Sequence, residues 1–158
     1  MALLIGKENC KIDSNGRFKF PVALKKQLQA SEDNRFAIRQ NIFSNCLELW
    51  TYCSFSEETT FLESTLERYN PEDMEILRVL TTANIVELDT NDRLLIPAEQ
   101  KGVLAQSKEI ILIGVGRYIE IWDAEEYNKR HKDVDLAEKV KNRLGKIDRG
   151  SIVNRENN

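Results

Sequence analysis

An internal repeat constrains the fold of this 158-residue chain more than any other feature. The segment CKIDSNGRFKFP at 10–21 is echoed 76 positions later by VELDTNDRLLIP at 86–97. After a four-residue difference the match resumes at an offset of 72, where LELW at 47–50 corresponds to IEIW at 119–122. Two blocks in the same order indicate a tandem duplication. One copy of roughly 45 residues is too small to bury a core alone, so we expect the copies to pack together about a pseudo-twofold axis.

Each copy carries the same predicted elements. A short alternating strand leads into a turn, and a second strand, a helix that begins at proline and a β-hairpin follow. Between the copies, Ser54 and Glu57 have capping-box spacing, and Asn70-Pro71 predicts the start of a second connecting helix. The apolar residues of these two helices are predicted to form stripes: Phe61, Leu62, Leu66 and Tyr69 on the first, and Met74, Leu77 and Leu80 on the second.

The predicted fold class is therefore α+β, with two β units packed as a small β-barrel and with peripheral helices. We expect four segments along the chain: a first repeat at 5–55, a helical connector at 56–82, a second repeat at 83–127 and a helical, frayed tail at 128–158.

The composition predicts a globular cytoplasmic protein. Hydrophobic residues make up 41% of the chain and charged residues 31%, which is typical of a folded domain. The longest apolar runs, such as 109–116, are far shorter than the ~20 residues of a membrane span, and the N-terminus shows no leader pattern. Cys10, Cys46 and Cys53 form no close pair, so we expect neither disulfides nor a zinc site. No cofactor, metal or small-molecule substrate is expected.

The net charge of −3 conceals a strong segregation along the chain. Residues 1–43 carry 8 basic and 4 acidic side chains, whereas residues 83–126 carry 4 basic and 9 acidic ones. What attracts an anion is the local field of a patch, so an acidic average does not exclude a nucleic-acid partner. Within the repeats, the first forty residues are where such a patch can form.

The repeated turn combines hairpin chemistry with a basic surface. Asn-Gly at 15–16 is a strong hairpin signal because such turns need positive φ, and Asp13 can accept hydrogen bonds from the turn amides. Turn chemistry does not explain Arg17. Lys11, Arg17 and Lys19 alternate, which places them on one face of the predicted hairpin. A two-stranded ribbon can enter the DNA major groove, but the same residues could also bind an acidic protein.

These motifs resemble the MraZ family of bacterial transcriptional regulators over residues 5 to about 130. The resemblance implies two tandem SpoVT-AbrB-like units, each with an Asp-x-x-Gly-Arg signature. It also implies a cytoplasmic, nucleoid-associated repressor that forms a ring-like homo-oligomer. Such a protein binds repeated promoter boxes of double-stranded DNA upstream of the division and cell-wall gene cluster. The predicted DNA-binding residues are Lys11, Asp13, Asn15, Gly16, Arg17, Lys19, Asp89 and Arg93.

One position departs from this signature. The second copy has Asp92 where the family pattern has glycine, beside Arg93 and close to Asp89. Two carboxylates near one guanidinium weaken its attraction to phosphate. We therefore expect the first copy to carry most of the DNA affinity and the second to serve mainly as a scaffold.

An enzyme is the main competing class, and the sequence does not favour it. His131 lies in a charged stretch typical of a solvated surface, and Gly114-x-Gly116 is followed by a strand, which predicts a hairpin turn rather than a phosphate loop. We expect Glu48 and Glu120 to face solvent. The tryptophans of the same strands, Trp50 and Trp122, are expected in the core.

A non-enzymatic alternative stays open at this stage. The basic hairpin could dock an acidic regulator as a protein-interaction module, or the chain could be an antitoxin-like regulator that uses a similar β unit. Chains of the antitoxin kind usually have one unit and a disordered toxin-binding tail, whereas this chain has two units and only a short tail.

Overall fold

The computed structural model describes residues 3–28, 33–104, 108–130 and 135–145. The strands are β1 (Leu4–Lys11), β2 (Arg17–Lys19), β3 (Arg35–Gln40), β4 (Leu47–Thr51), β5 (Asn84–Glu87), β6 (Arg93–Leu95), β7 (Glu109–Gly116) and β8 (Ile119–Asp123). The helices are α1 (Val22–Lys25), α2 (Tyr52–Thr65), α3 (Pro71–Thr81), α4 (Ala98–Lys101), the 3₁₀ turn η1 (Gly102–Leu104), α5 (Ala124–Arg130) and α6 (Leu136–Leu144). None of these described helices has the length and apolar character needed to cross a membrane.

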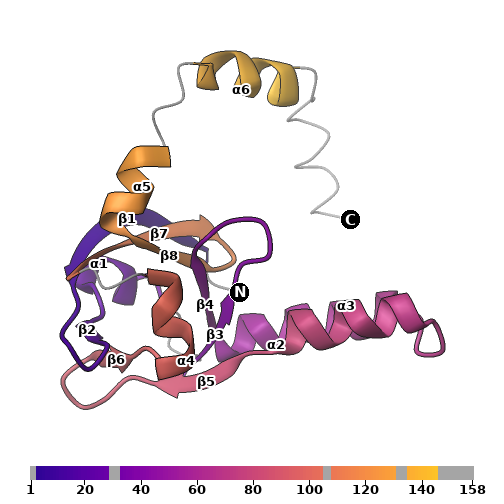
Figure 1. Ribbon diagram of the computed structural model, residues 1–158, viewed down its shortest axis with the longest axis horizontal. Coiled ribbons are helices and arrows are strands. Elements are labelled where there is room, and N and C mark those ends of the chain that lie inside the picture. Colours follow the sequence, from indigo (N-terminus) through magenta and orange to yellow (C-terminus); the bar gives the residue numbers. More distant parts are fainter. Residues whose placement is uncertain (1–2, 29–32, 105–107, 131–134, 146–158) are drawn as a thin grey trace. The chain divides into compact units, whose positions relative to one another are not determined.

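The strands form a six-stranded antiparallel sheet in the order β1-β7-β8-β4-β3-β5 and a two-stranded ribbon of β2 and β6 (Figure 1). The predicted hairpins β3–β4 and β7–β8 are both present. Each copy's first strand pairs with the hairpin of the other copy, β1 with β7 and β5 with β3. The two copies therefore exchange strands instead of forming separate sheets.

Equivalent residues of the two copies face each other at two places. In the ribbon, Phe18 is the register partner of Leu94, which lies 76 positions later. In the sheet, Glu48 is the register partner of Glu120, which lies 72 positions later. These separations equal the two offsets of the sequence repeat.

The closed β-barrel expected from the sequence is not observed. Within the described part of the chain, β1 and β5 form the two edges of an open sheet. The ribbon strands β2 and β6 pair with each other, and an isolated bridge between Ile12 and Phe18 joins the ribbon to the residue that follows β1. No strand pairing among the described residues links β1 to β5. The architecture is α+β, with an antiparallel sheet and several helices.

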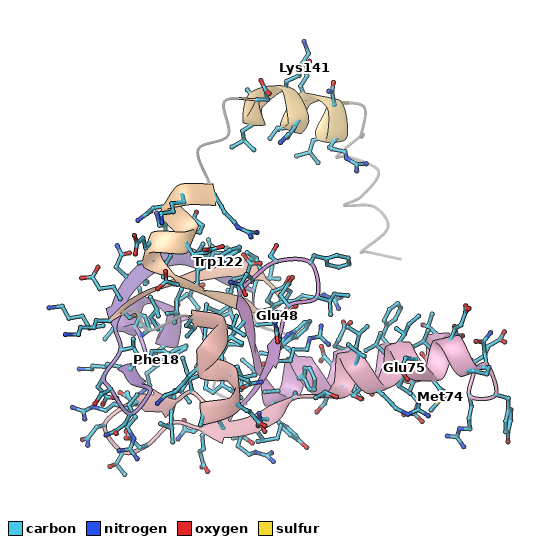
Figure 2. The ribbon with its side chains drawn as sticks, viewed as in Figure 1. Phe18, Glu48, Met74, Glu75, Trp122 and Lys141 are labelled. Carbon is cyan, nitrogen blue, oxygen red and sulfur yellow. The ribbon has the colours of Figure 1, made fainter. Side chains whose placement is uncertain are left out.

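The main core lies between the sheet and the ribbon. Alternate residues of the central strands point into it. The ribbon closes it from the other side with Phe18, labelled in Figure 2, and with its register partner Leu94. Its largest fully buried side chains include Phe20, Phe36, Leu24, Leu47, Ile96 and Leu112.

The second face of the sheet is also covered, which corrects one expectation. Trp50 packs against Phe55 of α2, and Trp122 packs against Tyr127 of α5, so both tryptophans are core residues as predicted. Glu48 was expected to face solvent, yet it is 5% exposed. Glu48 lies on the same face of β4 as Trp50, and helices α2 and α5 cover that face of the sheet.

The connecting helices α2 and α3 form an antiparallel pair that extends away from the sheet (Figure 1). Asn70 caps α3 as predicted, because its side chain accepts from the N–H groups of Glu72 and Asp73. The predicted cap at Ser54 is wrong: the Thr51 hydroxyl caps α2 instead, and it accepts from the N–H of Ser54. Strand β4 ends at Thr51 and α2 begins at Tyr52, whereas a cap at Ser54 predicted a first helical residue at position 55. The helix therefore begins three residues earlier than predicted.

The apolar stripes on these helices are only partly buried. Leu62 is buried and Leu66 half-buried, but Phe61 is 58% exposed and Tyr69 is 95% exposed. On α3 the predicted residues Met74, Leu77 and Leu80 are half-buried. Part of the first predicted stripe therefore lies at the surface because the helix pair extends beyond the sheet.

Two further details differ from the sequence-based expectation. Gly114 and Gly116 belong to β7, and the reversal follows at residues 117–118. Pro21 and Pro97 were expected at the first helical position, but they are the N-cap residues of α1 and α4, so each helix begins one residue later than predicted.

The chain divides into two compact units, Met1–Tyr127 and Asn128–Asn158. In the second unit α6 has no buried residue. His131 and the expected fraying beyond residue 145 lie outside the described residues.

Candidate nucleic-acid interface

The first turn, at 13–17, is organised by Asp13. The Asp13 N–H donates to the Arg17 carbonyl at 2.9 Å, and the Gly16 N–H donates to the Asp13 carbonyl at 3.0 Å. The carboxylate Oδ1 accepts from the N–H groups of Asn15 and Arg17, both at 2.9 Å. One aspartate thus fixes the backbone on both sides of the turn tip.

The second turn repeats this geometry around Asp89. The Asp89 N–H donates to the Arg93 carbonyl at 3.0 Å, and the Asp92 N–H donates to the Asp89 carbonyl at 3.1 Å. The Asp89 Oδ1 accepts from Asn91 at 2.8 Å and from Arg93 at 2.9 Å. Replacement of glycine by Asp92 has therefore not changed the backbone of the turn.

The residue before each arginine has the left-handed conformation. Gly16 has φ 90°, and Asp92, with φ 59°, is the non-glycine residue with positive φ in the described chain. This conformation aims the carbonyl of each residue at the other copy. The Gly16 carbonyl accepts from Ile96 N–H and the Asp92 carbonyl accepts from Phe20 N–H, both at 2.8 Å. Each turn is therefore anchored on the residue just after the strand that follows the opposite turn.

The hydrogen bonds from the turn amides lower the pKa of both aspartates. For Asp13 the largest cause is the backbone N–H of Arg17, and for Asp89 it is that of Arg93. The positive charge of Arg17 also lowers the pKa of Asp89. Ionisation of these carboxylates stabilises the turns above the pKa of an unfolded aspartate. That contribution is lost as the pH falls through the lowered folded-state pKa.

An acid titration tests this linkage. The amide signals of Arg17 and Arg93 in ¹H–¹⁵N spectra should titrate with midpoints below the ordinary aspartate pKa of 3.8. The Asp13→Asn variant should lose the titration at Arg17 and retain it at Arg93. A midpoint at or above the ordinary value would show that these hydrogen bonds do not favour the ionised carboxylates.

The ribbon between the turns presents a basic face. Phe18 is buried and lies opposite Leu94, so its neighbours on the strands point the other way. That face carries Arg17, Lys19 and Arg93, all exposed, with Lys19 directly opposite Arg93. None of these three side chains forms a salt bridge within the described residues. Like charges facing each other repel, and a polyanion relieves that repulsion.

The structure changes the predicted grouping of the basic residues. Arg17 and Lys19 do share one face, but their strand partner is β6 of the second copy rather than β1. Lys11 ends β1 in the six-stranded sheet, opposite Glu109. Asn15 is exposed at the turn tip, as predicted. The ribbon therefore brings Arg93 to Lys19, a juxtaposition that a hairpin within one copy could not produce.

Known proteins are similar in sequence to this chain over most of its length. The sequence model of the family described as "MraZ protein, putative antitoxin-like" matches residues 79–146. A protein of Christiangramia forsetii named Transcriptional regulator MraZ is 38% identical over 149 residues, covering 89% of this chain and 94% of the relative. The chain belongs to the MraZ family. Proteins with the same name from Flavobacterium psychrophilum (34% identical, 89% of this chain and 92% of the relative) and Bacteroides thetaiotaomicron (32%, 79% and 81%) are also similar.

Two lysines complete the surroundings of the turns in this MraZ-family chain. Lys25 of α1 extends to the second turn, where its Nζ lies 2.6 Å from the Asp92 carboxylate. Lys101 of α4 extends to the first turn, where its Nζ donates to the Ser14 carbonyl at 3.3 Å. Sequence reasoning missed Lys101, although it lies 76 positions after Lys25, the offset of the repeat.

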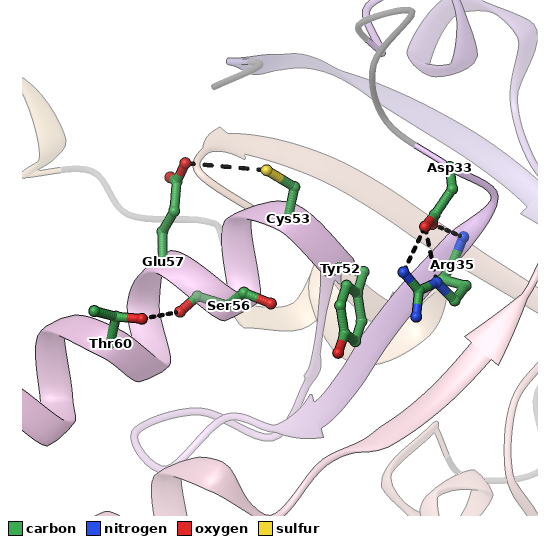
Figure 3. Close-up of a pocket in the computed structure, with 7 residues that line it drawn as sticks. All are labelled: Asp33, Arg35, Tyr52, Cys53, Ser56, Glu57 and Thr60. Atoms are coloured by element: carbon green, nitrogen blue, oxygen red, sulfur yellow. Dashed lines mark hydrogen bonds and ion pairs between the residues drawn. The ribbon is translucent and has the colours of Figure 1, made fainter.

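A surface cavity lies elsewhere in this MraZ-family chain (Figure 3). It measures about 570 Å³ and is lined by Asp33, Arg35, Tyr52, Cys53, Ser56, Glu57 and Thr60. The Arg35 guanidinium donates to Asp33 and lies 3.9 Å from the centre of the Tyr52 ring. Cys53 lies 4.0 Å from a carboxylate oxygen of Glu57. These polar groups pair with one another instead of converging on the cavity, so we assign it no function.

Proposed function

We propose that this chain is a sequence-specific, DNA-binding transcriptional regulator. It acts as a repressor of the division and cell-wall gene cluster, and it has no enzymatic activity. The observation that carries this proposal is the exposed basic face of the β2–β6 ribbon, held between two hydrogen-bonded turns. A two-stranded ribbon fits the DNA major groove, and arginine is the commonest side chain that recognises guanine there. The relatives' common name, Transcriptional regulator MraZ, supports the same conclusion.

The residues have distinct roles in this proposal. Arg17 makes the principal contact to a base or phosphate, and Lys11, Asn15 and Lys19 support it. The turn residues hold these contacts in place through backbone hydrogen bonds: Asp13 and Gly16 in the first copy and Asp89 in the second. Arg93 adds a weaker contact from the second copy.

The proposal includes two tandem SpoVT-AbrB-like units, 5–55 and 83–127, joined by a helical connector at 56–82 and followed by the tail at 128–158. The pairing of equivalent residues across the ribbon and the sheet supports this division. A ring-like homo-oligomer in the cytoplasm, associated with the nucleoid, would engage several neighbouring promoter boxes at once and gain affinity by avidity. A chain that stays monomeric by light scattering while it binds such boxes tightly would contradict the oligomer.

The decisive experiment measures DNA binding by fluorescence anisotropy. A duplex from immediately upstream of the protein's own gene is compared with a scrambled duplex of the same composition at several salt concentrations. We expect tighter binding to the native duplex and a log–log salt slope of about 0.9 per neutralised phosphate. Equal, weak and salt-insensitive binding to both duplexes would contradict a DNA-binding function and would favour an acidic protein partner.

A further inference from the structure

The two turns differ in the anion available to the lysine that reaches them. At the second turn, the Lys25 ammonium has a carboxylate partner in Asp92. At the first turn, the equivalent position is Gly16, which has no side chain, and the Lys101 side chain lies directly above it. A Cβ at Gly16 would clash with Cε of Lys101. Lys101 therefore occupies the space that a side chain at Gly16 would need.

The two ammonium groups are left with different bonding capacities. An ammonium group has three N–H donors. Lys101 has the Ser14 carbonyl as its partner in the described structure, a neutral acceptor at 3.3 Å. Lys25 makes a shorter, charge-assisted contact with Asp92 at 2.6 Å. A phosphate oxygen could join Lys101 without displacing a carboxylate, whereas at Lys25 it would compete with one.

We propose that Asp92 is an internal counter-ion that takes, at the second turn, the place that a DNA phosphate takes at the first. Lys101 is then a contact to the DNA backbone, and Lys25 is not. This inference rests on the proposed DNA-binding function. It assigns Lys101, a residue of the second copy, to the DNA contact of the first turn, and it makes Asp92 the residue that determines the asymmetry between the turns.

The structure gives a different reason from the sequence for the expected difference in DNA affinity between the two turns. The sequence suggested that Asp92 weakens its neighbour Arg93. In the structure the Asp92 carboxylate instead pairs with Lys25 of the first copy. Both side chains of this pair are about two-fifths exposed, at 43% and 39%, so the pair contributes little to stability and can be altered without unfolding the chain.

Three variants test the inference through the salt dependence of binding to the native duplex. Lys101→Met keeps most of the aliphatic stem over Gly16 and removes the charge, so the log–log slope should fall by about 0.9. Asp92→Asn removes the counter-ion while asparagine tolerates the left-handed backbone, so the slope should rise by about 0.9 and binding should tighten. The charge-neutral double variant Lys25→Met/Asp92→Asn should bind as the unaltered protein does.

The outcomes separate this inference from the proposed function. The DNA-binding function itself fails if the unaltered protein shows no salt-dependent preference for the native duplex. It also fails if the Arg17→Ala variant binds that duplex as tightly as the unaltered protein. If binding depends on Arg17 but the double variant loses as much slope as Lys101→Met, Lys25 already contacts DNA and only the inference fails. An unchanged slope in both Lys101→Met and Asp92→Asn would also overturn it. Thermal melts of each variant check that the fold is retained.

Discussion

Replacing Arg17 with alanine should weaken binding to the native upstream duplex by one to two orders of magnitude, about 1–3 kcal/mol. The guanidinium is exposed on the basic face of the ribbon and forms no salt bridge within the described residues, so DNA does not have to displace a protein carboxylate from it. Its backbone N–H is held by the Asp13 carboxylate, so little backbone freedom is lost on binding. Anisotropy titrations with the native and scrambled duplexes measure the effect.

A matched variant separates a specific contact from a general loss of charge. Arg78→Ala removes the same charge from α3, where Arg78 pairs with Glu75 on an exposed surface. It should leave the affinity almost unchanged. Equal affinities of Arg17→Ala and Arg78→Ala would show that the ribbon is not the DNA-binding surface. If Arg17 contacts a base, its loss should also reduce the preference for the native over the scrambled duplex.

Arg93→Ala provides the comparison between the two copies. We expect a smaller loss than for Arg17→Ala because Asp92 already neutralises Lys25 at the second turn, so a phosphate beside Arg93 gains no second cation there. Equal losses would mean that both turns contact DNA to the same extent, and the predicted asymmetry would be wrong.

The sequence predicted the elements that depend on local chemistry. The alternation of apolar residues located the hairpins β3–β4 and β7–β8, and Asn70 marked the start of α3. Asp13 forms the predicted hydrogen bonds to turn amides, and Asp89 of the second copy forms the equivalent ones. Each of these features involves residues close together in the chain, so a short segment contains the whole signal.

The sequence did not predict how the two copies pair. Strand β2 was expected to form a hairpin with the strand before it. The structure keeps the turn and one bridge of that hairpin, Ile12 with Phe18, but the strand partner of β2 is β6 of the other copy. The contacts of Lys25 with Asp92 and of Lys101 with Ser14 follow from that exchange. A repeat in the sequence shows that the copies are alike, but it does not show whether equivalent strands pair within a copy or between copies.

The burial of Glu48 was missed for a related reason. An apolar-Glu-apolar-Trp strand is typical of a sheet with one solvated face. Here α2 and α5 cover that face, so the glutamate lies beside Trp50 within the protein. Its positive partner, Arg39, is nine residues away on the neighbouring strand β3. Arg39 and Glu48 are register partners, and the predicted β3–β4 hairpin could have indicated their pairing.

Removing the buried partner of Arg39 should have the largest effect on stability. The Glu48 Oε1 accepts from Arg39 Nε at 2.8 Å and from Trp50 Nε1 at 2.9 Å, and its Oε2 accepts from Asn41 at 2.8 Å. Both charged side chains are less than a tenth exposed, at 8% for Arg39 and 7% for Glu48. Glu48→Ala leaves the guanidinium buried and uncompensated, which should cost about 3–5 kcal/mol. Urea denaturation followed by circular dichroism measures the loss.

Glu120 offers a matched control for this prediction because it lies directly opposite Glu48 in the sheet. It is half-buried and accepts from Trp122 Nε1 at 3.2 Å, and no arginine pairs with it in the described structure. Glu120→Ala should therefore cost clearly less free energy of unfolding than Glu48→Ala.

Arg39 also donates to the Leu80 carbonyl near the end of α3, so displacement of the Arg39 side chain should loosen the contact of the helix pair with the sheet. The apolar double variant Arg39→Met/Glu48→Leu removes both charges and should recover much of the loss. If Glu48→Ala and Glu120→Ala destabilise the protein equally, the cost comes from the lost tryptophan hydrogen bond and not from the buried charge of Arg39.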